Sequence, residues 1–501
     1  MTQANQILLE MFDAGTFRVN GHALIDLLAE ELQRNLDAGR PVLQWREPAT
    51  EDANWQAPLP QQATLDLNGF IEKLKKDILP GNLAIHHPRN LGHQVATPLP
   101  VAALCDLVAS LTNQAMAVYE TGPTATMLER QVLRWLSSLI GWQSAAVNGV
   151  LTSGGAQANL TALLAARQHA DKNASQSTRQ HTSPQDIWLH GLAASPRLRI
   201  LASAHSHYSI ARAAGIMGLG TEAVIAIATD AQGRMCPNAM ISAHENCLTR
   251  GERVMAVVAS AGCTPTGSID PLKVIGEYCA VHQLWLHVDG AHGASALLSR
   301  RHSAMLEGIA LADSITWDGH KLLYMPATVS AVLFRSAANG RQAFAQNASY
   351  LFEEKPQEEQ DFNVSYRTLE CTKRMMALKL WAAFSLYGVE GMAALVDEAF
   401  AKAGRFAAMI GATDDFELLM EPQTNIVCFR HLVAGINASE LNRHQAATRK
   451  RLIESGDFHL TQVELDGVLW LRTTLMNPFT EEADLQALLD AIRAQPASKA
   501  P

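Results

Sequence analysis

Two side chains that can carry cofactor chemistry, Asp289 and Lys321, each follow a short apolar run in the sequence. Trp285–Val288 (WLHV) leads directly into Asp289, and Ser314–Trp317 (SITW) leads into the letters DGHK, which end at Lys321. The strands of a parallel sheet are buried on both faces, so they read as short apolar runs, and chemistry gathers at their carboxyl ends. The sequence therefore predicts an acid and an amine at the same edge of a parallel sheet.

An acid and a lysine in this arrangement suit the cofactor pyridoxal 5'-phosphate (PLP). PLP requires a lysine amine that forms a Schiff base with its aldehyde, and an acid that keeps its pyridine nitrogen protonated. The protonated ring withdraws electrons, which makes a carbanion at the α-carbon of a bound amino acid accessible. Considered separately, Lys321 would be interpreted as a surface lysine and Asp289 as an ordinary strand-end aspartate.

Together, the segments HVDGAHGA and DSITWDGHK resemble the group II PLP-dependent amino-acid decarboxylases, which include glutamate, aromatic amino-acid and 2,4-diaminobutyrate decarboxylases. The resemblance covers most of the chain and is strongest between residues 81 and 380. It implies that Lys321 holds the cofactor, that Asp289 pairs with the pyridine nitrogen and that Ala291 packs against the ring. It also implies that Asp318 contacts the cofactor and that His320 helps to place the phosphate or relays a proton.

The chain departs from the family pattern at two glycines next to these residues. Relatives usually have Ala at the position of Gly290 and Pro at the position of Gly319. Neither position carries a chemical role in the resemblance. The departures therefore indicate a less familiar branch of the family.

A second motif reads SGGAQ, and it leads from an apolar run into a helix that is expected to end near Arg167. Small residues let the backbone approach an anion, and the first N–H groups of a helix have no partner inside the helix. A glycine pair alone is a weak signal. Ahead of a lysine site it resembles the phosphate cradle of the family, and we assign that role to Ala156 and Gln157.

Two further segments lie after strand-like runs. His207 follows the run Leu198–Ser203, and the resemblance places its ring flat against PLP, where an aromatic face orients the cofactor. A single histidine is more often structural, so its position after a strand is the feature that favours a site. The turn at residues 261–267 resembles a Gly-Thr-Thr segment of the family and puts Thr264 near the cofactor, although Cys263 stands where a Thr is common.

Three candidate residues lie outside the predicted sheet edge. Tyr350 opens a polar, acidic loop of the kind that often closes over substrate. In the resembled family this tyrosine protonates the carbanion after CO₂ leaves; a surface tyrosine is the alternative. His93 lies in a segment rich in hydrogen-bond donors, which favours a substrate-facing loop and a solvated loop equally. Arg472 lies in an expected strand, where the family places an arginine near the substrate carboxylate; a surface arginine is the alternative.

The composition is that of an ordinary globular protein, with 48% apolar and 18% charged residues among 501. A net charge of −9 argues against nucleic acid or an anionic membrane as the main partner. The seven cysteines are scattered and form no CxxC pair, so neither a disulfide framework nor a metal site is expected. The sequence shows no signal peptide and no long uncharged apolar run, so a soluble, cytoplasmic protein is expected.

Strand-like and helix-like segments alternate between about residues 145 and 335, which predicts an α/β fold with a mainly parallel sheet and helices on both faces. The resemblance implies the fold type I architecture of PLP enzymes, and a homodimer with active sites at the subunit interface. We expect an N-terminal helical segment (residues 1–90) that packs on the partner subunit, a large PLP-binding domain (91–385) and a small C-terminal α+β domain (386–501).

The sequence thus predicts PLP-dependent decarboxylation of a small-molecule substrate, an L-amino acid, to the corresponding amine and CO₂. An aminotransferase or a decarboxylating aldehyde synthase of the same fold is the alternative. Tyr350 argues against the synthase, because the family has phenylalanine there in such enzymes. A non-catalytic binding protein is disfavoured by the joint presence of Lys321, Asp289 and His207. The sequence does not indicate the side chain of the substrate.

Overall fold

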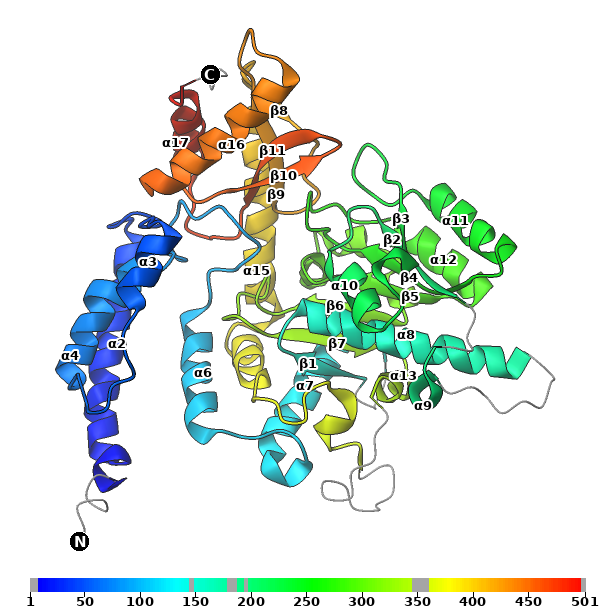
Figure 1. Ribbon diagram of the computed structural model, residues 1–501, viewed down its shortest axis with the longest axis horizontal. Helices are drawn as coiled ribbons and strands as arrows, with labels where there is room; N and C mark the ends of the chain where they lie inside the picture. The colour runs from blue at the N-terminus through cyan, green and yellow to red at the C-terminus, as the bar shows by residue number, and fades with distance from the viewer. Residues whose placement is uncertain (1–7, 144–147, 178–186, 193–196, 345–359, 497–501) are drawn as a thin grey trace. The chain divides into compact units, whose positions relative to one another are not determined.

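The computed structural model describes residues 8–143, 148–177, 187–192, 197–344 and 360–496 (Figure 1). The chain divides into two compact units. Unit 1 comprises residues 1–93, 408–419 and 428–501, and unit 2 comprises residues 94–407 and 420–427. The three-part division at residues 90 and 385 stays a prediction. None of the described helices has the length and apolar character that crossing a bilayer requires.

Unit 2 contains a sheet with seven strands in the described part of the chain: β1 (Gly149–Thr152), β2 (Leu198–Ser203), β3 (Val224–Ile227), β4 (Arg253–Ser260), β5 (Trp285–Asp289), β6 (Ser314–Asp318) and β7 (Ser330–Phe334). Their order is β1-β7-β6-β5-β4-β2-β3. From β3 to β6 all neighbours run parallel, whereas β7 runs antiparallel to both β6 and β1. This confirms the predicted mainly parallel sheet.

Helices cover both faces of this sheet. The described helices of unit 2 are α6 (Pro100–Thr112), α7 (Pro123–Ile140), α8 (Gly155–Ser177), α9 (Ile187–His190), α10 (Ser209–Ile216), α11 (Pro237–Thr249), α12 (Leu272–His282), α13 (Ala337–Gln342) and α15 (Ala377–Gly411), and those that contact strands of the sheet include α7, α8, α10, α11, α12 and α13. Ile200 and Val258 belong to the apolar core that includes α8. Leu201 and Val257 are equally buried and point to the opposite face, because side chains alternate along a strand. α8 contacts β4 to β7, whereas α11 and α12 contact β2 to β5.

The prediction for the end of α8 is wrong. The sequence predicts that this helix ends near Arg167 and that a polar insertion follows over residues 168–186. The helix continues to Ser177. Five of its last ten residues (168–177) are Ala, Gln or Lys, which have high helix propensity and sustain a helix without an apolar period, so polarity alone does not indicate a loop here. Residues 178–186 lie outside the described part of the chain.

The site is placed by the ends of two adjacent strands. All five residues of β5 and all five of β6 are buried. The strands run parallel, with Asp289 opposite Thr316 in the register. Because both strands run in the same direction, their terminal acids, Asp289 and Asp318, come to the same edge of the sheet. The apolar residues of β5 and β6 are thus buried in the sheet, and the last residue of each strand places a carboxylate at its edge.

Unit 1 combines N-terminal helices with a smaller C-terminal sheet. Its helices are α2 (Ala14–Leu36), α3 (Pro48–Trp55), α4 (Leu67–Lys73), α5 (Leu79–Gly81), α16 (Ala438–Ser455) and α17 (Glu482–Arg493). The sheet has the order β10-β11-β9-β8, with β8 (Phe416–Leu418), β9 (Ile426–His431), β10 (Thr461–Leu465) and β11 (Val468–Thr474). β8 pairs antiparallel with β9, and β10 with β11, while α16 packs on β10, β11 and α17. This confirms the predicted C-terminal α+β region.

Candidate active site

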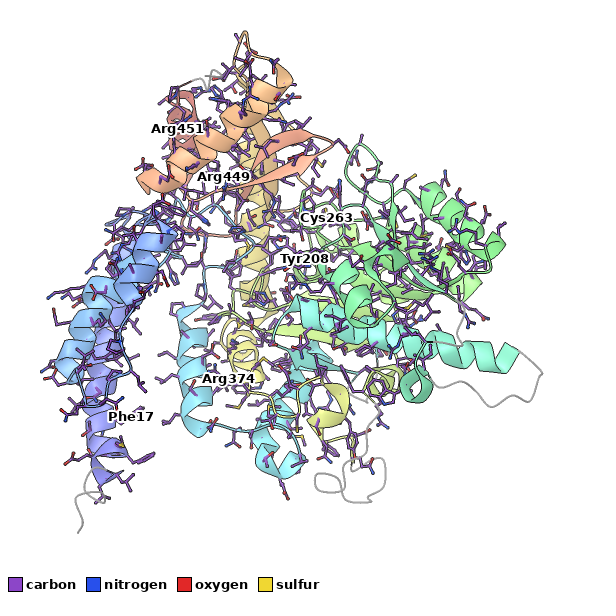
Figure 2. All side chains as sticks on the ribbon, in the orientation of Figure 1. Phe17, Tyr208, Cys263, Arg374, Arg449 and Arg451 are labelled. Atoms are coloured by element: carbon purple, nitrogen blue, oxygen red, sulfur yellow. The ribbon has the colours of Figure 1, made fainter. Side chains whose placement is uncertain are left out.

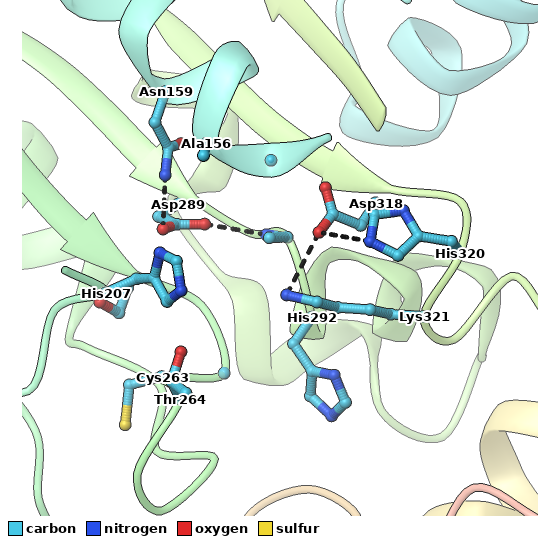
Figure 3. A pocket seen from close by; sticks show the side chains of 14 residues that line it. Ala156, Asn159, His207, Cys263, Thr264, Asp289, His292, Asp318, His320 and Lys321 are labelled. Atoms are coloured by element: carbon cyan, nitrogen blue, oxygen red, sulfur yellow. Dashed lines mark hydrogen bonds and ion pairs between the residues drawn. The ribbon is translucent and has the colours of Figure 1, made fainter. Parts of the chain in front are cut away.

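A cavity of about 190 Å³ lies in unit 2, at the ends of β5 and β6 and the first turn of α8 (Figure 3). It brings together most of the residues that the sequence predicts for the site. These residues come from separate elements and are Ala156, His207, Thr264, Asp289, Ala291, Asp318, His320 and Lys321. The cavity is thus lined by one amine, two carboxylates and several imidazoles.

Lys321 follows β6 by three residues, and its amine reaches the cavity. Its Nζ lies 3.2 Å from Oδ2 of Asp318, which forms an ion pair with it. Asp318 is only 2% exposed, and it accepts a hydrogen bond from the hydroxyl of Ser330 on its other oxygen. Nε2 of His320 lies 3.6 Å from the same carboxylate oxygen that faces the lysine. The carboxylate of Asp318 therefore holds the lysine at the cavity wall, while Nδ1 of His320 lies 2.9 Å from the carbonyl oxygen of Val329.

Asp289, at the end of β5, has neutral partners instead. Its Oδ2 accepts a hydrogen bond of 2.9 Å from Nδ2 of Asn159, and its Oδ1 accepts one of 3.2 Å from the backbone N–H of Ala291. In the described part of the chain it forms no ion pair. Its negative charge is thus fixed in position and is directed at the cavity, which is the environment that a protonated pyridine nitrogen requires.

The imidazole of His207 lies beside Asp289 (Figure 3). Nδ1 lies 2.8 Å from the hydroxyl of Ser209 and accepts a 3.3 Å hydrogen bond from the backbone N–H of the same residue. Burial lowers the pKa of His207, while the negative charge of Asp289 acts in the opposite direction. The ring therefore presents a neutral, oriented face to the cavity.

The first turn of α8 approaches the end of β6 closely. A Cβ added at Gly155 would lie 2.9 Å from Oδ1 of Asp318, so only glycine fits at this turn without displacing the carboxylate. The backbone N–H groups of Gly155 and Ala156 belong to the first turn and have no acceptor within the helix, which suits an anion such as a phosphate. Gln157 does not line the cavity; its side-chain oxygen accepts a 2.6 Å hydrogen bond from Ser153.

Gly290 and Gly319, the two glycines that differ from the resembled family pattern, lie in tight packing. A Cβ at Gly290 would lie 2.9 Å from the Cβ of Ala294, and one at Gly319 would lie 2.9 Å from Cγ1 of Val329. Glycine at both positions lets these segments approach more closely than a side chain would allow. Neither glycine lines the cavity.

The remaining predicted residues are not in this cavity. His93 and Arg472 belong to unit 1, where Arg472 is buried on β11 and its Nη1 donates a 3.2 Å hydrogen bond to the hydroxyl of Thr461. The expectation that Arg472 could be a surface residue on an edge strand is therefore not met. Tyr350 lies outside the described residues. The roles of all three stay predictions.

Sequence reasoning missed several residues that line the cavity. Asn159 lies one helical turn after Ala156, so the spacing alone could have indicated that both face the same side. His292, three residues after Asp289, also lines it, and its Nε2 is 2.6 Å from Oδ1 of Asn425. Gly155, Ser260, Gly262 and Cys263 complete the lining.

The residues of this cavity fit PLP. A phosphate requires unpaired N–H donors, which the first turn of α8 supplies beside a glycine that leaves room for an anion. An aldehyde requires an accessible amine, which Lys321 supplies. A pyridine nitrogen requires a fixed carboxylate, which Asp289 supplies. The donor set therefore matches each polar end of the cofactor.

Comparisons with known proteins support the same interpretation. Residues 50–432 match the description "Pyridoxal-dependent decarboxylase conserved domain". The cysteine sulfinic acid decarboxylase of Rattus norvegicus is 30% identical, over 92% of this chain and 92% of its own. The L-2,4-diaminobutyrate decarboxylase of Acinetobacter baumannii is 28% identical, over 87% of this chain and 85% of its own.

The fold agrees as well. The crystal structure of mouse CSAD superimposes with a TM-score of 0.86 at 26% identity, over 95% of this chain and 98% of that chain. This likeness confirms the predicted fold type I architecture, and the family match confirms the predicted cofactor and reaction class. Since the matched domain spans well over half of the sequence, the chain belongs to the group II pyridoxal-dependent decarboxylases, which release CO₂ from amino acids with PLP.

Proposed function

We propose that this chain releases CO₂ from an L-amino acid in the unit 2 cavity, with Lys321 as the residue that holds PLP. The observation that carries the proposal is the placement of Lys321, Asp289 and His207 around one cavity at the sheet edge. Family membership supplies the reaction class, and the geometry supplies the side chains that perform it.

PLP, when bound, supplies the electron sink that stabilises the charge left on the α-carbon as CO₂ departs. Asp289 would hold the proton on the pyridine nitrogen. Its carboxylate is already fixed by the amide of Asn159 and the N–H of Ala291, so it does not have to reorganise during the reaction. A preorganised charge of this kind stabilises a transition state more than a mobile one does.

His207 and Ala291 would flank the ring of the cofactor on its two faces. Because burial lowers the pKa of His207, its imidazole stays neutral near pH 7. A neutral ring packs against the cofactor without placing a second positive charge beside the protonated pyridine. The first turn of α8, at Ala156, would bind the phosphate, with Gln157, Thr264 and His320 as further contacts.

Three roles rest on the sequence alone: those of Tyr350 and Arg472 on the family resemblance, and that of His93 on its donor-rich segment. Tyr350 would deliver a proton to the α-carbon after CO₂ has left. Arg472 would bind the carboxylate of the substrate, with His93 as a neighbouring donor. A screen of Tyr350→Phe for aldehyde in place of amine tests the first role, since phenylalanine has no proton to give.

The class of amino acid is a separate question. Relatives include a decarboxylase named for an acidic substrate, cysteine sulfinic acid, and one named for a basic substrate, L-2,4-diaminobutyrate. We propose an amino acid of one of these two kinds. The test measures CO₂ release from cysteine sulfinate, aspartate, glutamate, diaminobutyrate and lysine, with tryptophan as the aromatic control.

We also propose that the protein is a homodimer. Apolar side chains on one side of α6 are about half exposed, which is unusual for a helix of a monomeric protein: Leu104, Leu107, Val108 and Leu111. Exposed apolar residues also occur on α2, among them Phe17 (Figure 2). Light scattering with size-exclusion chromatography should give twice the mass of the 54.4 kDa chain; a monomeric mass contradicts the proposal.

A cytoplasmic location is the remaining proposal. All seven cysteines are free thiols in the structure, and several are buried. Free thiols persist where the environment is reducing. Fractionation of the native host, with immunodetection of this chain, tests the location; recovery with membranes or outside the cell contradicts it.

The decisive experiment on the site is covalent. Borohydride reduction of the holoenzyme, followed by peptide mass mapping, should find the pyridoxyl group on Lys321. The matched control is Lys373, which is 4% exposed and paired with Glu129 away from the cavity, and it should carry no label. A label on any other lysine contradicts the assignment.

A further inference from the structure

A row of buried polar side chains runs behind the cavity, from Trp285 through Ser314, His287 and Asn159 to Asp289. Ser314 and His287 are 0% exposed, and Asn159 is 1% exposed. Of this row, only Asn159 and Asp289 line the cavity. Burying polar groups costs free energy unless each is hydrogen-bonded, so the connections along this row determine what it can do.

The direction of each hydrogen bond follows from the first donor. The indole N–H of Trp285 can only donate, and it lies 2.9 Å from Oγ of Ser314. Ser314 accepts there, which leaves its own proton for Nδ1 of His287, 2.9 Å away. With Nδ1 as an acceptor, a neutral imidazole carries its proton on Nε2. That nitrogen lies 3.0 Å from Oδ1 of Asn159 and donates to it.

The imidazole of His287 is neutral because burial lowers its pKa to about 4, although Asp289 acts in the opposite direction. The other tautomer would donate from Nδ1 to the carbonyl of Ser314 at 3.2 Å. Nε2 would then need a donor, so the amide of Asn159 would have to turn over. Its oxygen would face the carboxylate of Asp289 at 2.9 Å, where two acceptors repel.

The orientation of the Asn159 amide determines the hydrogen bonds of two residues that line the cavity, Asp289 directly and His207 through Ser209. Since its oxygen accepts from His287, its nitrogen supplies two donors, one to Asp289 and one to Ser209, each at 2.9 Å. The hydroxyl of Ser209 accepts there and donates to Nδ1 of His207 at 2.8 Å. The proton of His207 is therefore on Nε2. One directional chain fixes both the acid and the imidazole that face the cofactor.

We propose that His287 is a positioning residue for the decarboxylase reaction: by donating from Nε2 it locks Asn159 in the orientation that holds Asp289 and, through Ser209, His207. His287 touches neither cofactor nor substrate and acts only through Asn159. The inference rests on the proposed function, because it takes Asp289 and His207 as the residues that face PLP.

The test measures the dissociation constant of PLP from the apoenzyme by absorbance titration. His287→Leu keeps apolar volume but removes the donor, and we expect PLP to bind about tenfold more weakly, as the loss of one hydrogen bond to a positioning group predicts. His287→Gln, whose side-chain amide can donate in place of Nε2, should bind PLP within about threefold of wild type. If the imidazole only fills space, His287→Leu and His287→Gln should bind PLP with the same affinity.

A double-mutant cycle separates positioning from packing. Asn159→Ala should weaken PLP binding about tenfold, and adding His287→Leu should cause no further loss, because the path runs through the amide. Additive losses, or wild-type affinity of His287→Leu, overturn the inference. His444→Leu is the matched control: His444 is also 0% exposed but lies in unit 1, so its loss should leave PLP affinity unchanged.

Asp289→Asn distinguishes a failure of this inference from a failure of the proposed function. If Asp289→Asn leaves both the affinity and the absorption of bound PLP unchanged, the proposed role of Asp289 is wrong. If Asp289→Asn changes them and His287→Leu does not, only the inference about His287 is wrong. Should His287→Leu not fold, Ser314→Ala removes the hydroxyl that selects the tautomer. We expect about threefold weaker PLP binding, absent in an Asn159→Ala background; unchanged affinity overturns the inference.

Discussion

Two adjacent strands of unit 2 end in aspartates whose surroundings differ. Asp289, at the end of β5, is held by two neutral N–H donors, from Asn159 and Ala291. Asp318, at the end of β6, is held by the ammonium of Lys321 and by the hydroxyl of Ser330, and Nε2 of His320 lies 3.6 Å from it. Both acids are buried, so each needs partners to remain in place.

The difference indicates how the two charges are used. Neutral donors fix Asp289 without cancelling its charge, so the full negative charge is available to a cationic ring. At Asp318 the charge is already opposed by Lys321, so its main effect is to position the amine. One fold thus places two identical side chains at one sheet edge and gives them different electrostatic surroundings, and we propose that their tasks differ accordingly.

The largest effect on turnover is expected when the negative charge of Asp289, which no cation of the described chain opposes, is removed. Asp289→Asn should lower turnover about 10³-fold, because a preorganised charge facing the cofactor is lost. The free energy of unfolding should fall by about 1–3 kcal/mol. Asp289 accepts hydrogen bonds from two N–H groups, and the NH₂ group of the new amide would face one of them, so that two donors oppose each other. Steady-state CO₂ release and urea unfolding measure the two quantities. Near wild-type turnover with bound PLP would show that the charge of Asp289 is not used.

His287, which supports Asp289 through Asn159, should also make the stability of the protein sensitive to acid. His287 has a pKa of about 4 in the folded protein and about 6.5 when unfolded. As pH falls from 6.5 to 4, the unfolded chain therefore binds more protons than the folded one, and stability is lost over this range. The loss from this group is about 3 kcal/mol, and it is fully regained above pH 6.5.

Urea unfolding of wild type and of His287→Gln at pH 7 and pH 4 checks this value. The variant lacks the imidazole, so its stability should fall less on acidification than that of wild type. The other buried histidines, such as His444, titrate in both proteins and cancel in the difference. An identical pH dependence of the two proteins would contradict the assignment of this component to His287.

The sequence was sufficient for the parts of the site that lie at strand ends. Asp289, Lys321 and His207 each follow an apolar run, and parallel strands bring such residues to one edge regardless of the loops between them. Ala156 was predictable for a related reason, because a helix that begins with glycine exposes its N–H groups. Local pattern and strand direction were enough to predict a shared sheet edge, whereas the choice of His207 and Ala156 as cofactor contacts also needed the resemblance to the decarboxylase family.

The supporting residues could not be found in this way. His287 lies inside a strand and Asn159 inside a helix, where single polar residues read as part of an apolar core. Their hydrogen bond joins positions 128 residues apart, which no local pattern specifies. A polar residue in a run buried on both faces was still a usable signal, because it must have a partner. The full length of α8 was not predicted, because the polar residues after Arg167 resemble a loop although the helix continues through them to Ser177.

The smallest effect is expected at the acid whose charge is already opposed. Asp318→Asn keeps an oxygen for the hydroxyl of Ser330 but presents an amide N–H to the ammonium of Lys321, so the lysine loses its ion pair. Lys321 keeps its amine in this variant and loses only one charge-assisted hydrogen bond. Turnover should therefore fall about tenfold, far less than in Asp289→Asn. Borohydride labelling should still find Lys321. Ser330→Ala is the control, since it removes the hydroxyl that donates to the other oxygen of Asp318 and retains the ion pair with Lys321, and its effect on turnover should be smaller again. If Asp318→Asn reduces turnover as much as Asp289→Asn does, the charge of Asp318 also acts in the reaction, and the contrast between the two strand ends is wrong.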